Sequence, residues 1–93
     1  MTDNTYLLGI DFGTESVRAA IFDLAGRPVS FAATAYRTTH PHPGWAEQDP
    51  EEWWEALQAS CRKVIAASGV SPSAIKGISY DATTMTVVAM DKR

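Results

Sequence analysis

Apolar and polar residues follow one another along this chain in patterns that predict strands first and a helix later. The nearly continuous apolar run at residues 6–10 predicts a strand covered on both faces. Residues 16–23 alternate between the two faces of a second strand, and a turn at residues 24–27 precedes a third strand over residues 28–36. These three segments predict an antiparallel meander.

A helix is predicted to begin sharply after the meander. Asp49 can cap its backbone, Pro50 suits the first helical position, and Glu52 completes the pattern of a capping box. Gly69 is well placed to end the helix in a left-handed conformation. We expect Trp53 and Trp45 to pack beside the helix start. The apolar stripe predicted to face the core comprises Trp54, Leu57, Cys61, Val64 and Ile65.

The remaining segments predict loops and two further strands. Residues 38–44 carry two prolines and one glycine among polar residues and are expected to form an extended, solvent-exposed loop. His40 and His42 in this loop lack partners for a metal site. Residues 71–75 form a second loop, followed by strands at 76–81 and 86–90. A meander, a crossover helix and a parallel strand together predict an α/β domain.

Asp11 and the glycine turn after it carry the clearest chemical signal. Asp11 ends the first strand, and the turn of Gly13, Thr14 and Glu15 leads into the second. A carboxylate there can hold a hydrated divalent cation, while a glycine lets backbone N–H groups approach phosphate oxygens. The hairpin would return Arg18 to Asp11 or to an anionic phosphate. An ordinary β-hairpin with a surface aspartate explains the same pattern, so both interpretations stay open at this point.

A second polar segment follows the fourth predicted strand. Asp81, Ala82 and Thr83 emerge at its carboxyl end, the edge where open α/β sheets bind ligands. A carboxylate and small hydroxyl side chains suit a polyhydroxylated substrate. We expect this segment to lie apart from the Asp11 turn, so that substitutions in it weaken binding of the polyhydroxylated substrate and leave phosphate binding nearly unchanged. The alternative is that these residues form only a polar turn between two strands.

Five segments resemble the FGGY carbohydrate kinases of the actin and hexokinase superfamily. They are GIDFGTESVR (9–18), IFDLAGR (21–27), GWAEQDPEEWW (44–54), IKGISYDAT (75–83) and VVAMD (87–91). The third is the most specific to the family, whereas the first is shared across the superfamily. The resemblance implies part of a ribonuclease-H-like, actin/hexokinase-type α/β domain.

The resemblance also implies a reaction, transfer of the γ-phosphoryl group of ATP to a hydroxyl of a small sugar. It assigns ATP and Mg²⁺ to Asp11, Gly13, Thr14, Glu15 and Arg18, with Asp11 holding the metal through water. It implies that the general base lies beyond residue 93, so no residue of this chain receives that role.

Asp81, Ala82 and Thr83 would border the sugar pocket in such a kinase. Their Asp-Ala-Thr form resembles the ribulokinase-like branch and departs from the Gln-Arg-Glu of glycerol kinases and the Gln-Met/His of xylulose kinases. A pentulose such as ribulose is therefore the expected substrate. Xylulose, glycerol and other polyols stay open.

Composition narrows the remaining classes. The chain has 93 residues, a single cysteine and a net charge of −3, which disfavours nucleic-acid binding and excludes an intrachain disulfide. No leader or membrane-spanning run is apparent, so we expect a cytoplasmic protein without a membrane partner. The resembling kinases are several times longer. We therefore expect residues 1–93 to be the N-terminal part of a first kinase domain and to be inactive alone; a homo-oligomer stays open.

Two other classes of function are kept as alternatives. Ribonuclease-H-like nucleases also carry an aspartate at the end of the first strand, where it binds metal, although a basic surface would be expected of them. A non-catalytic domain is the third class.

Overall fold

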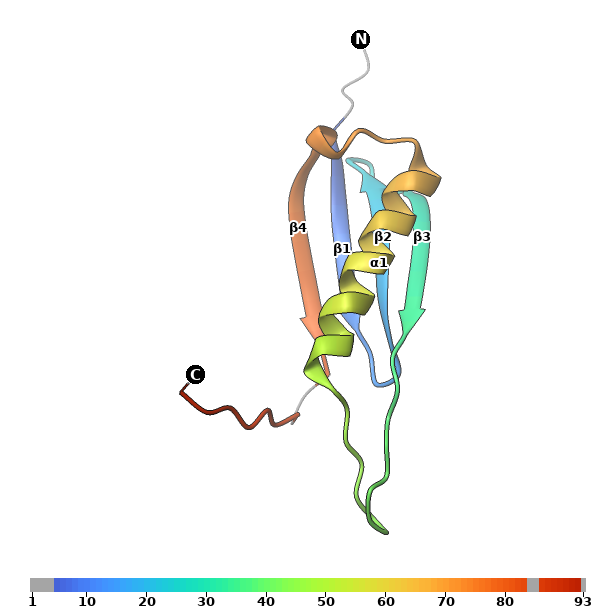
Figure 1. The fold of residues 1–93 in the computed structure, drawn as a ribbon. Helices are drawn as coiled ribbons and strands as arrows, with labels where there is room; N and C mark the ends of the chain where they lie inside the picture. Colours follow the sequence, from blue (N-terminus) through green and yellow to red (C-terminus); the bar gives the residue numbers. More distant parts are fainter. Residues whose placement is uncertain (1–4, 84–85, 93) are drawn as a thin grey trace.

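A computed structural model describes residues 5–83 and 86–92 of the chain. It contains a four-stranded sheet of order β3-β2-β1-β4, crossed by one long helix (Figure 1). The elements in chain order are β1 (Tyr6–Phe12), β2 (Ser16–Asp23), β3 (Pro28–Ala35), α1 (Pro50–Ser68), the short 3₁₀ helix η1 (Pro72–Ala74) and β4 (Ile75–Ala82). Strands β1, β2 and β3 pair antiparallel, whereas β4 returns parallel to β1. The predicted meander, crossover helix and parallel strand are confirmed.

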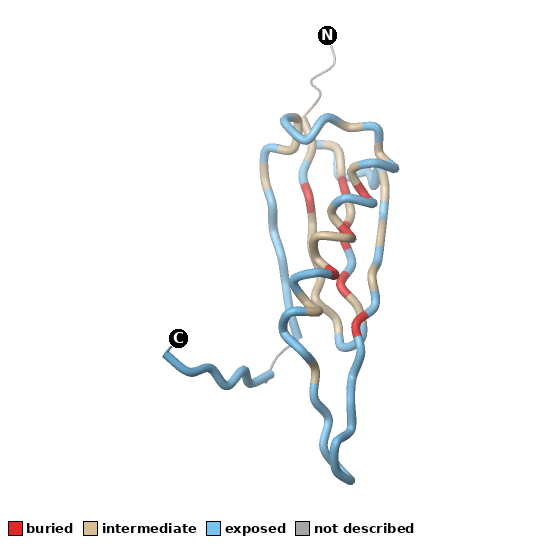
Figure 2. The backbone as a smooth tube through the Cα atoms, viewed as in Figure 1, coloured by how far each residue is buried: buried red, intermediate tan, exposed pale blue. Residues whose placement is uncertain are grey.

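Helix α1 covers one face of the sheet and forms the core with it. Leu8, Ile21 and Val64 lie in one buried cluster, and Val17 and Ala56 lie in a second. In Figure 2 the buried segments, coloured red, lie along the helix and the strands that it crosses. The alternation predicted for β2 is confirmed, because its odd-numbered residues are the ones that face α1.

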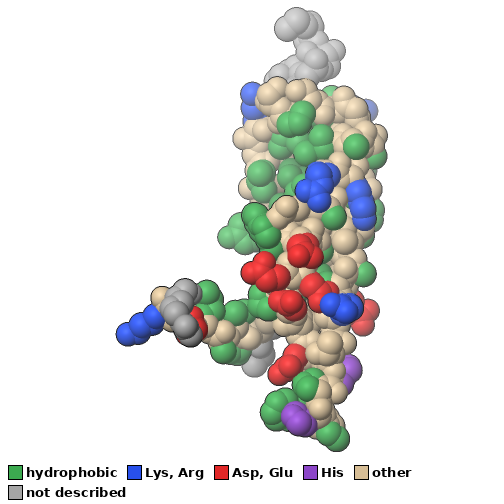
Figure 3. All heavy atoms as spheres, viewed as in Figure 1, with side chains coloured by type: hydrophobic (Ala, Val, Ile, Leu, Met, Phe, Trp, Pro, Cys, Tyr) green, Lys and Arg blue, Asp and Glu red, His purple; other side chains and the backbone are tan. Residues whose placement is uncertain are grey.

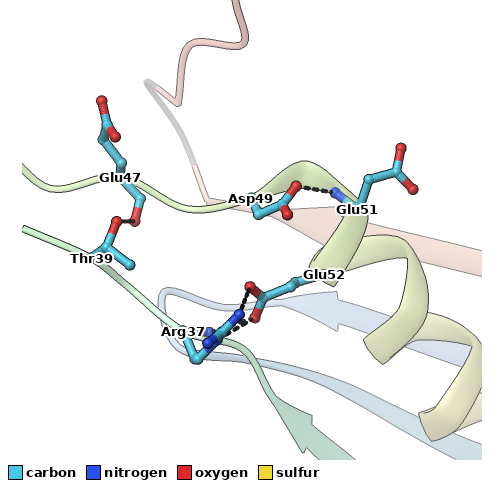
Figure 4. Close-up of polar contacts among 6 residues, drawn as sticks. All are labelled: Arg37, Thr39, Glu47, Asp49, Glu51 and Glu52. Atoms are coloured by element: carbon cyan, nitrogen blue, oxygen red, sulfur yellow. Dashed lines mark hydrogen bonds and ion pairs between the residues drawn. The ribbon is translucent and has the colours of Figure 1, made fainter. Parts of the chain in front are cut away.

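The start of α1 confirms some predictions and corrects others. The Asp49 carboxylate accepts a hydrogen bond from the backbone N–H of Glu51 at 2.9 Å, so Asp49 is the N-cap, and Pro50 is the first helical residue. The capping box is wrong, because the Glu52 carboxylate turns instead to Arg37 and accepts from its guanidinium at 2.9 Å (Figure 4). Gly69 ends the helix at φ 71°, as predicted.

The predicted place of Trp54 in the core is wrong. Trp54 is 59% exposed, whereas Trp53 packs against the cluster around Val17. The fully covered line of the helix passes through Ala56, Ser60 and Val64 instead. Leu57, Cys61 and Ile65 flank that line as partly buried residues. Acidic side chains gather over the first turns of α1 (Figure 3), where they favour the positive end of the helix dipole.

The segment after β4 differs from its prediction. Residues 86–92 form no strand in the structure, and Val87 and Met90 are exposed. A strand needs a neighbouring strand to accept its backbone hydrogen bonds, and the apolar pattern alone does not provide one. Thr84, which the sequence places in the same polar segment as Thr83, lies outside the described residues. Within those residues no helix combines the length and apolarity needed to cross a bilayer.

An arm formed by residues 37–48 extends beyond the sheet between β3 and α1 (Figure 1). Thr39 and Glu47 pair across it, and His40 Nδ1 lies 2.8 Å from the Trp45 carbonyl oxygen. The exposed loop predicted here is confirmed, except for the bridge between Thr39 and Glu47. The returning side of the arm brings Gln48 next to the turn between β1 and β2.

Candidate functional site

The turn between β1 and β2 is tight, and neighbouring atoms leave no room for a side chain at Gly13. The Gly13 N–H donates to the Ser16 carbonyl at 2.8 Å. A Cβ at position 13 would lie 2.8 Å from Arg18 Nη2 and 3.2 Å from the Ser16 carbonyl oxygen. A side chain here would therefore displace the guanidinium and crowd the backbone. Gly13 permits Arg18 to lie against the turn.

Arg18 pairs with Asp11, as the hairpin predicts. The two residues are register partners on β2 and β1, and Arg18 Nη2 lies 2.5 Å from Asp11 Oδ2. Both side chains are about half-exposed, at 46% and 44%. The pair is therefore accessible to a ligand arriving at this end of the sheet.

Asp81 joins this pair from the other side of β1. It is the register partner of Asp11 in the parallel ladder. A hydrogen bond with the Asp11 carboxyl raises the pKa of Asp81, as do desolvation and the negative charge of Asp11, while the Arg18 charge opposes them. The expectation that Asp81 lies apart from the Asp11 turn is thus wrong. Register across two strands joins three charged groups into one cluster.

A groove on the sheet face opposite α1 ends at this cluster. Its volume is about 430 Å³. Its lining includes the small residues Gly9, Ala20 and Ser79 and the aromatic residues Phe22 and Phe31. The charged groups of Asp11, Arg18 and Asp81 lie at one end. The arrangement offers a polar end and an apolar wall to a ligand.

Ala82 and Thr83 lie at the same end of the sheet as the Gly13 turn. Ala82 pairs with Phe12, and the Thr83 N–H donates to the Phe12 carbonyl at 3.0 Å. The Thr83 hydroxyl lies 3.1 Å from that of Thr86. Thr14 and Thr83 border a second hollow of about 740 Å³, together with Gln48 and Trp53. Glu15 is an exposed residue of the turn itself.

Two residues that hold the turn were missed by sequence reasoning. Tyr36 is 8% exposed, and its hydroxyl donates to the carbonyl oxygens of Gly13 and Ser16. Burial raises the pKa of the Tyr36 hydroxyl, and the nearby charge of Asp11 adds to this effect. Gln48 Nε2 donates to the Thr14 carbonyl at 2.7 Å. The one available signal was a tyrosine at a strand end, whose hydroxyl needs a partner when buried.

The donor set at this end fits a magnesium ion better than a metal held wholly by protein. No group of three or more histidine, cysteine or acidic side chains gathers in the described part of the chain. Mg²⁺ commonly binds through one or two carboxylates, with water and substrate phosphates completing its shell. Asp11, with Asp81 beside it, supplies such a set.

Comparison with known proteins assigns the chain to a family. Residues 6–93 match the model of the FGGY family of carbohydrate kinases, N-terminal domain. A glycerol kinase of Methylibium petroleiphilum is 43% identical over 74 residues, which cover 80% of this chain and 15% of that protein. The glycerol kinase of Bacillus subtilis is 40% identical over 88 residues, covering 95% of this chain and 18% of that protein.

The fold is similar to that of a solved kinase. The crystal structure of xylulose kinase from Rhodospirillum rubrum superposes with a TM-score of 0.82 at 29% identity, covering 94% of this chain and 18% of that one. This similarity confirms the predicted partial α/β domain of the ribonuclease-H-like, actin/hexokinase type. The chain spans less than a fifth of each of these relatives, and over that span it belongs to the FGGY family of carbohydrate kinases.

Proposed function

We propose that the protein to which this chain contributes transfers the γ-phosphoryl group of ATP to a hydroxyl of a small sugar or polyol. The observation that carries the proposal is the cluster of Asp11, Arg18 and Asp81 beside the Gly13 turn, in a chain of the FGGY family. Phosphoryl transfer depends chiefly on positioning the phosphates and neutralising their charge. A carboxylate, a guanidinium and a glycine turn at one sheet edge suit both tasks.

Each residue of the turn has a proposed role toward the nucleotide. Asp11 holds Mg²⁺ through water, and the metal supplies charge neutralisation when bound. Gly13, whose own N–H donates to Ser16, lets the turn approach the phosphates, which the N–H groups of Thr14 and Glu15 face, with the Thr14 hydroxyl as a further donor. Arg18 leaves or shares its contact with Asp11 to meet a phosphate oxygen, since its side chain is 46% exposed.

We propose that Asp81, Ala82 and Thr83 border the sugar. A carboxylate and a hydroxyl can bind sugar hydroxyl groups, and Ala82 leaves space for a ketose. The Asp-Ala-Thr form favours a pentulose such as ribulose. Glycerol is the second candidate, because the two curated relatives described above are glycerol kinases.

The proposal also covers what this chain does not contain. Residues 1–93 are proposed to be the N-terminal part of the first of two kinase domains, with the general base and adenine site on later residues. Residues 1–93 alone are therefore proposed to be inactive. Use of ATP supports a cytoplasmic location, and the net charge of −3 supports no role for nucleic acid.

A substrate panel tests the proposal. The full-length protein is assayed for ADP formation with Mg²⁺, ATP and, in turn, ribulose, xylulose and glycerol. We expect sugar-dependent ADP formation with the highest kcat/KM for ribulose. A glycerol preference would replace the pentulose assignment, and ADP formation with no sugar dependence would overturn the kinase proposal. Metal-dependent cleavage of DNA or RNA by the same protein would support a nuclease instead.

A further inference from the structure

The turn between β1 and β2 is held from behind by residues far along the chain. The carbonyl oxygens of Gly13 and Ser16 accept from the Tyr36 hydroxyl. The Tyr36 backbone N–H donates to the Glu15 carbonyl at 3.0 Å, and Gln48 Nε2 donates to the Thr14 carbonyl at 2.7 Å. Two side chains and one backbone group thus bind four successive carbonyl groups.

Fixing these carbonyl groups also fixes the direction of the N–H groups. In a planar trans peptide, the C=O of one residue and the N–H of the next point in opposite directions. Because the Gly13 and Thr14 carbonyl groups point toward Tyr36 and Gln48, the N–H groups of Thr14 and Glu15 each point away from the side chain that binds the preceding carbonyl. Neither N–H donates to a backbone carbonyl of the described residues. Two adjacent N–H donors without a backbone partner among those residues are therefore left for a ligand, and adjacent backbone N–H groups can bind an anion.

The side-chain amide of Gln48 has its own support, which determines which end faces the turn. Trp53 Nε1 donates to Gln48 Oε1 at 2.8 Å, so the amide oxygen is directed to Trp53. The Nε2 end is left for the Thr14 carbonyl and for the Thr38 hydroxyl at 2.8 Å. Trp53 lies in the first turn of α1 and Gln48 lies in the arm just before the helix, so this contact links the helix to the turn.

We infer that Tyr36 and Gln48 are positioning residues for the nucleotide phosphates. They touch neither the sugar nor the reacting atoms, and they act by orienting the Thr14 and Glu15 N–H groups toward a phosphate. The inference rests on the proposed function, because it takes a phosphoryl donor as the anion. It extends the site from the β1–β2 hairpin to the arm and the helix start.

Two substitutions at Gln48 test the inference in the full-length protein. Gln48→Met removes all three hydrogen bonds of the amide at nearly constant size. Gln48→Glu keeps an acceptor for Trp53 and removes the donor to Thr14. We expect KM for ATP to rise about tenfold in both variants, the scale of one lost hydrogen bond to a preorganised group. KM for the sugar should stay within about twofold, because the turn binds phosphate rather than sugar.

Tyr36→Phe is the second test, because it removes the hydroxyl and keeps the buried ring. The same rise in KM for ATP, with a melting temperature lowered only slightly, is expected. Glu55→Gln is the matched control on α1, since Glu55 is exposed, and its kinetic constants should equal those of the wild type.

The outcomes separate this inference from the proposed function. A wild-type protein without sugar-dependent ADP formation overturns both. An active wild type whose Gln48→Glu variant keeps its KM for ATP overturns the positioning role alone, because the acceptor for Trp53 would then be sufficient. A rise in the sugar KM with an unchanged KM for ATP also overturns it, since Gln48 would then contact the sugar.

Discussion

Asp11→Asn tests whether the Asp11 carboxylate holds Mg²⁺ or serves only the structure of the hairpin. The substitution keeps size and a hydrogen-bond acceptor while removing the negative charge. The Asp11–Arg18 pair is about half-exposed on both sides, at 44% and 46%, so solvent screens it. Such pairs contribute about 0–1 kcal/mol to stability. The melting temperature should therefore change little.

The effect on turnover should be much larger than this structural effect. Removing one preorganised electrostatic contact lowers kcat by roughly 10²-fold or more, equivalent to about 2.7 kcal/mol of activation free energy. A loss of this size exceeds what the ion pair contributes to folding. We therefore expect a stable protein with roughly a hundredfold lower kcat, partly recovered at high Mg²⁺.

Asp23→Asn is the matched control for this experiment. Asp23 also pairs with an arginine, Arg27, at 3.3 Å, but it lies at the last residue of β2, far from the end where Arg18 meets Asp11. Hydrogen bonds from the backbone N–H groups of Arg27 and Ala25 and the charge of Arg27 lower the pKa of Asp23, while desolvation opposes them. Steady-state kinetics at varied Mg²⁺ and thermal melts are measured for both variants. Equal kcat in the Asp11 and Asp23 variants would show that Asp11 is only a hairpin residue.

Three further predictions concern the full-length protein. Asp81→Ala should raise KM for the sugar about 10- to 100-fold and, because Asp81 adjoins Asp11, should also raise KM for ATP. Steady-state kinetics with each substrate varied in turn measures both constants, and a change in only one of them would contradict the prediction. Hydrogen bonds from Arg37 lower the pKa of Glu52, so they stabilise the fold above the ordinary pKa of 4.5, and this stabilisation is lost as the pH falls through the lowered pKa. The wild type should therefore melt at a higher temperature than Glu52→Gln near neutral pH, and this difference should shrink below pH 4.5. A difference that stays constant with pH would refute this prediction. Val64→Ala should lower the free energy of unfolding by about 2 kcal/mol in urea titrations, because Val64 is fully buried. The control substitution Arg62→Ala, at an exposed residue, should lower it by about 0.5 kcal/mol or less, and equal losses would place Val64 outside the core.

Much of the fold could be predicted from local patterns. The bounds of β2 follow from its alternation, and both ends of α1 follow from Asp49 and Gly69, whose preferences are strong and local. Trp54 was predicted to be core because it continues the helical spacing of Cys61 and Ile65. The covered line of the helix instead passes through Ala56, Ser60 and Val64, on the side of Trp53. Alanine and serine on that line give no strong apolar signal in the sequence.

Of the contacts at the site, the sequence predicted those within one hairpin and missed those between distant segments. Asp11, Gly13 and Arg18 belong to one hairpin, so their proximity follows from a short turn. The contact between Asp11 and Asp81 depends on the register of β4 against β1, which are far apart in sequence. The hydrogen bond of Gln48 to Thr14 spans 34 residues and depends on where the arm returns. Such long-range contacts leave no periodic signal in the sequence.

Transfer of labelled phosphate tests the central claim most directly. The full-length protein is incubated with Mg²⁺, ATP labelled in its γ-phosphoryl group, and ribulose, xylulose or glycerol, and the label is followed by chromatography. We predict that the label appears in a sugar or polyol monophosphate, in amounts equal to the ADP formed, and that Asp11→Asn abolishes most of this transfer. Label found only in inorganic phosphate, or full transfer by the Asp11→Asn variant, would contradict the account.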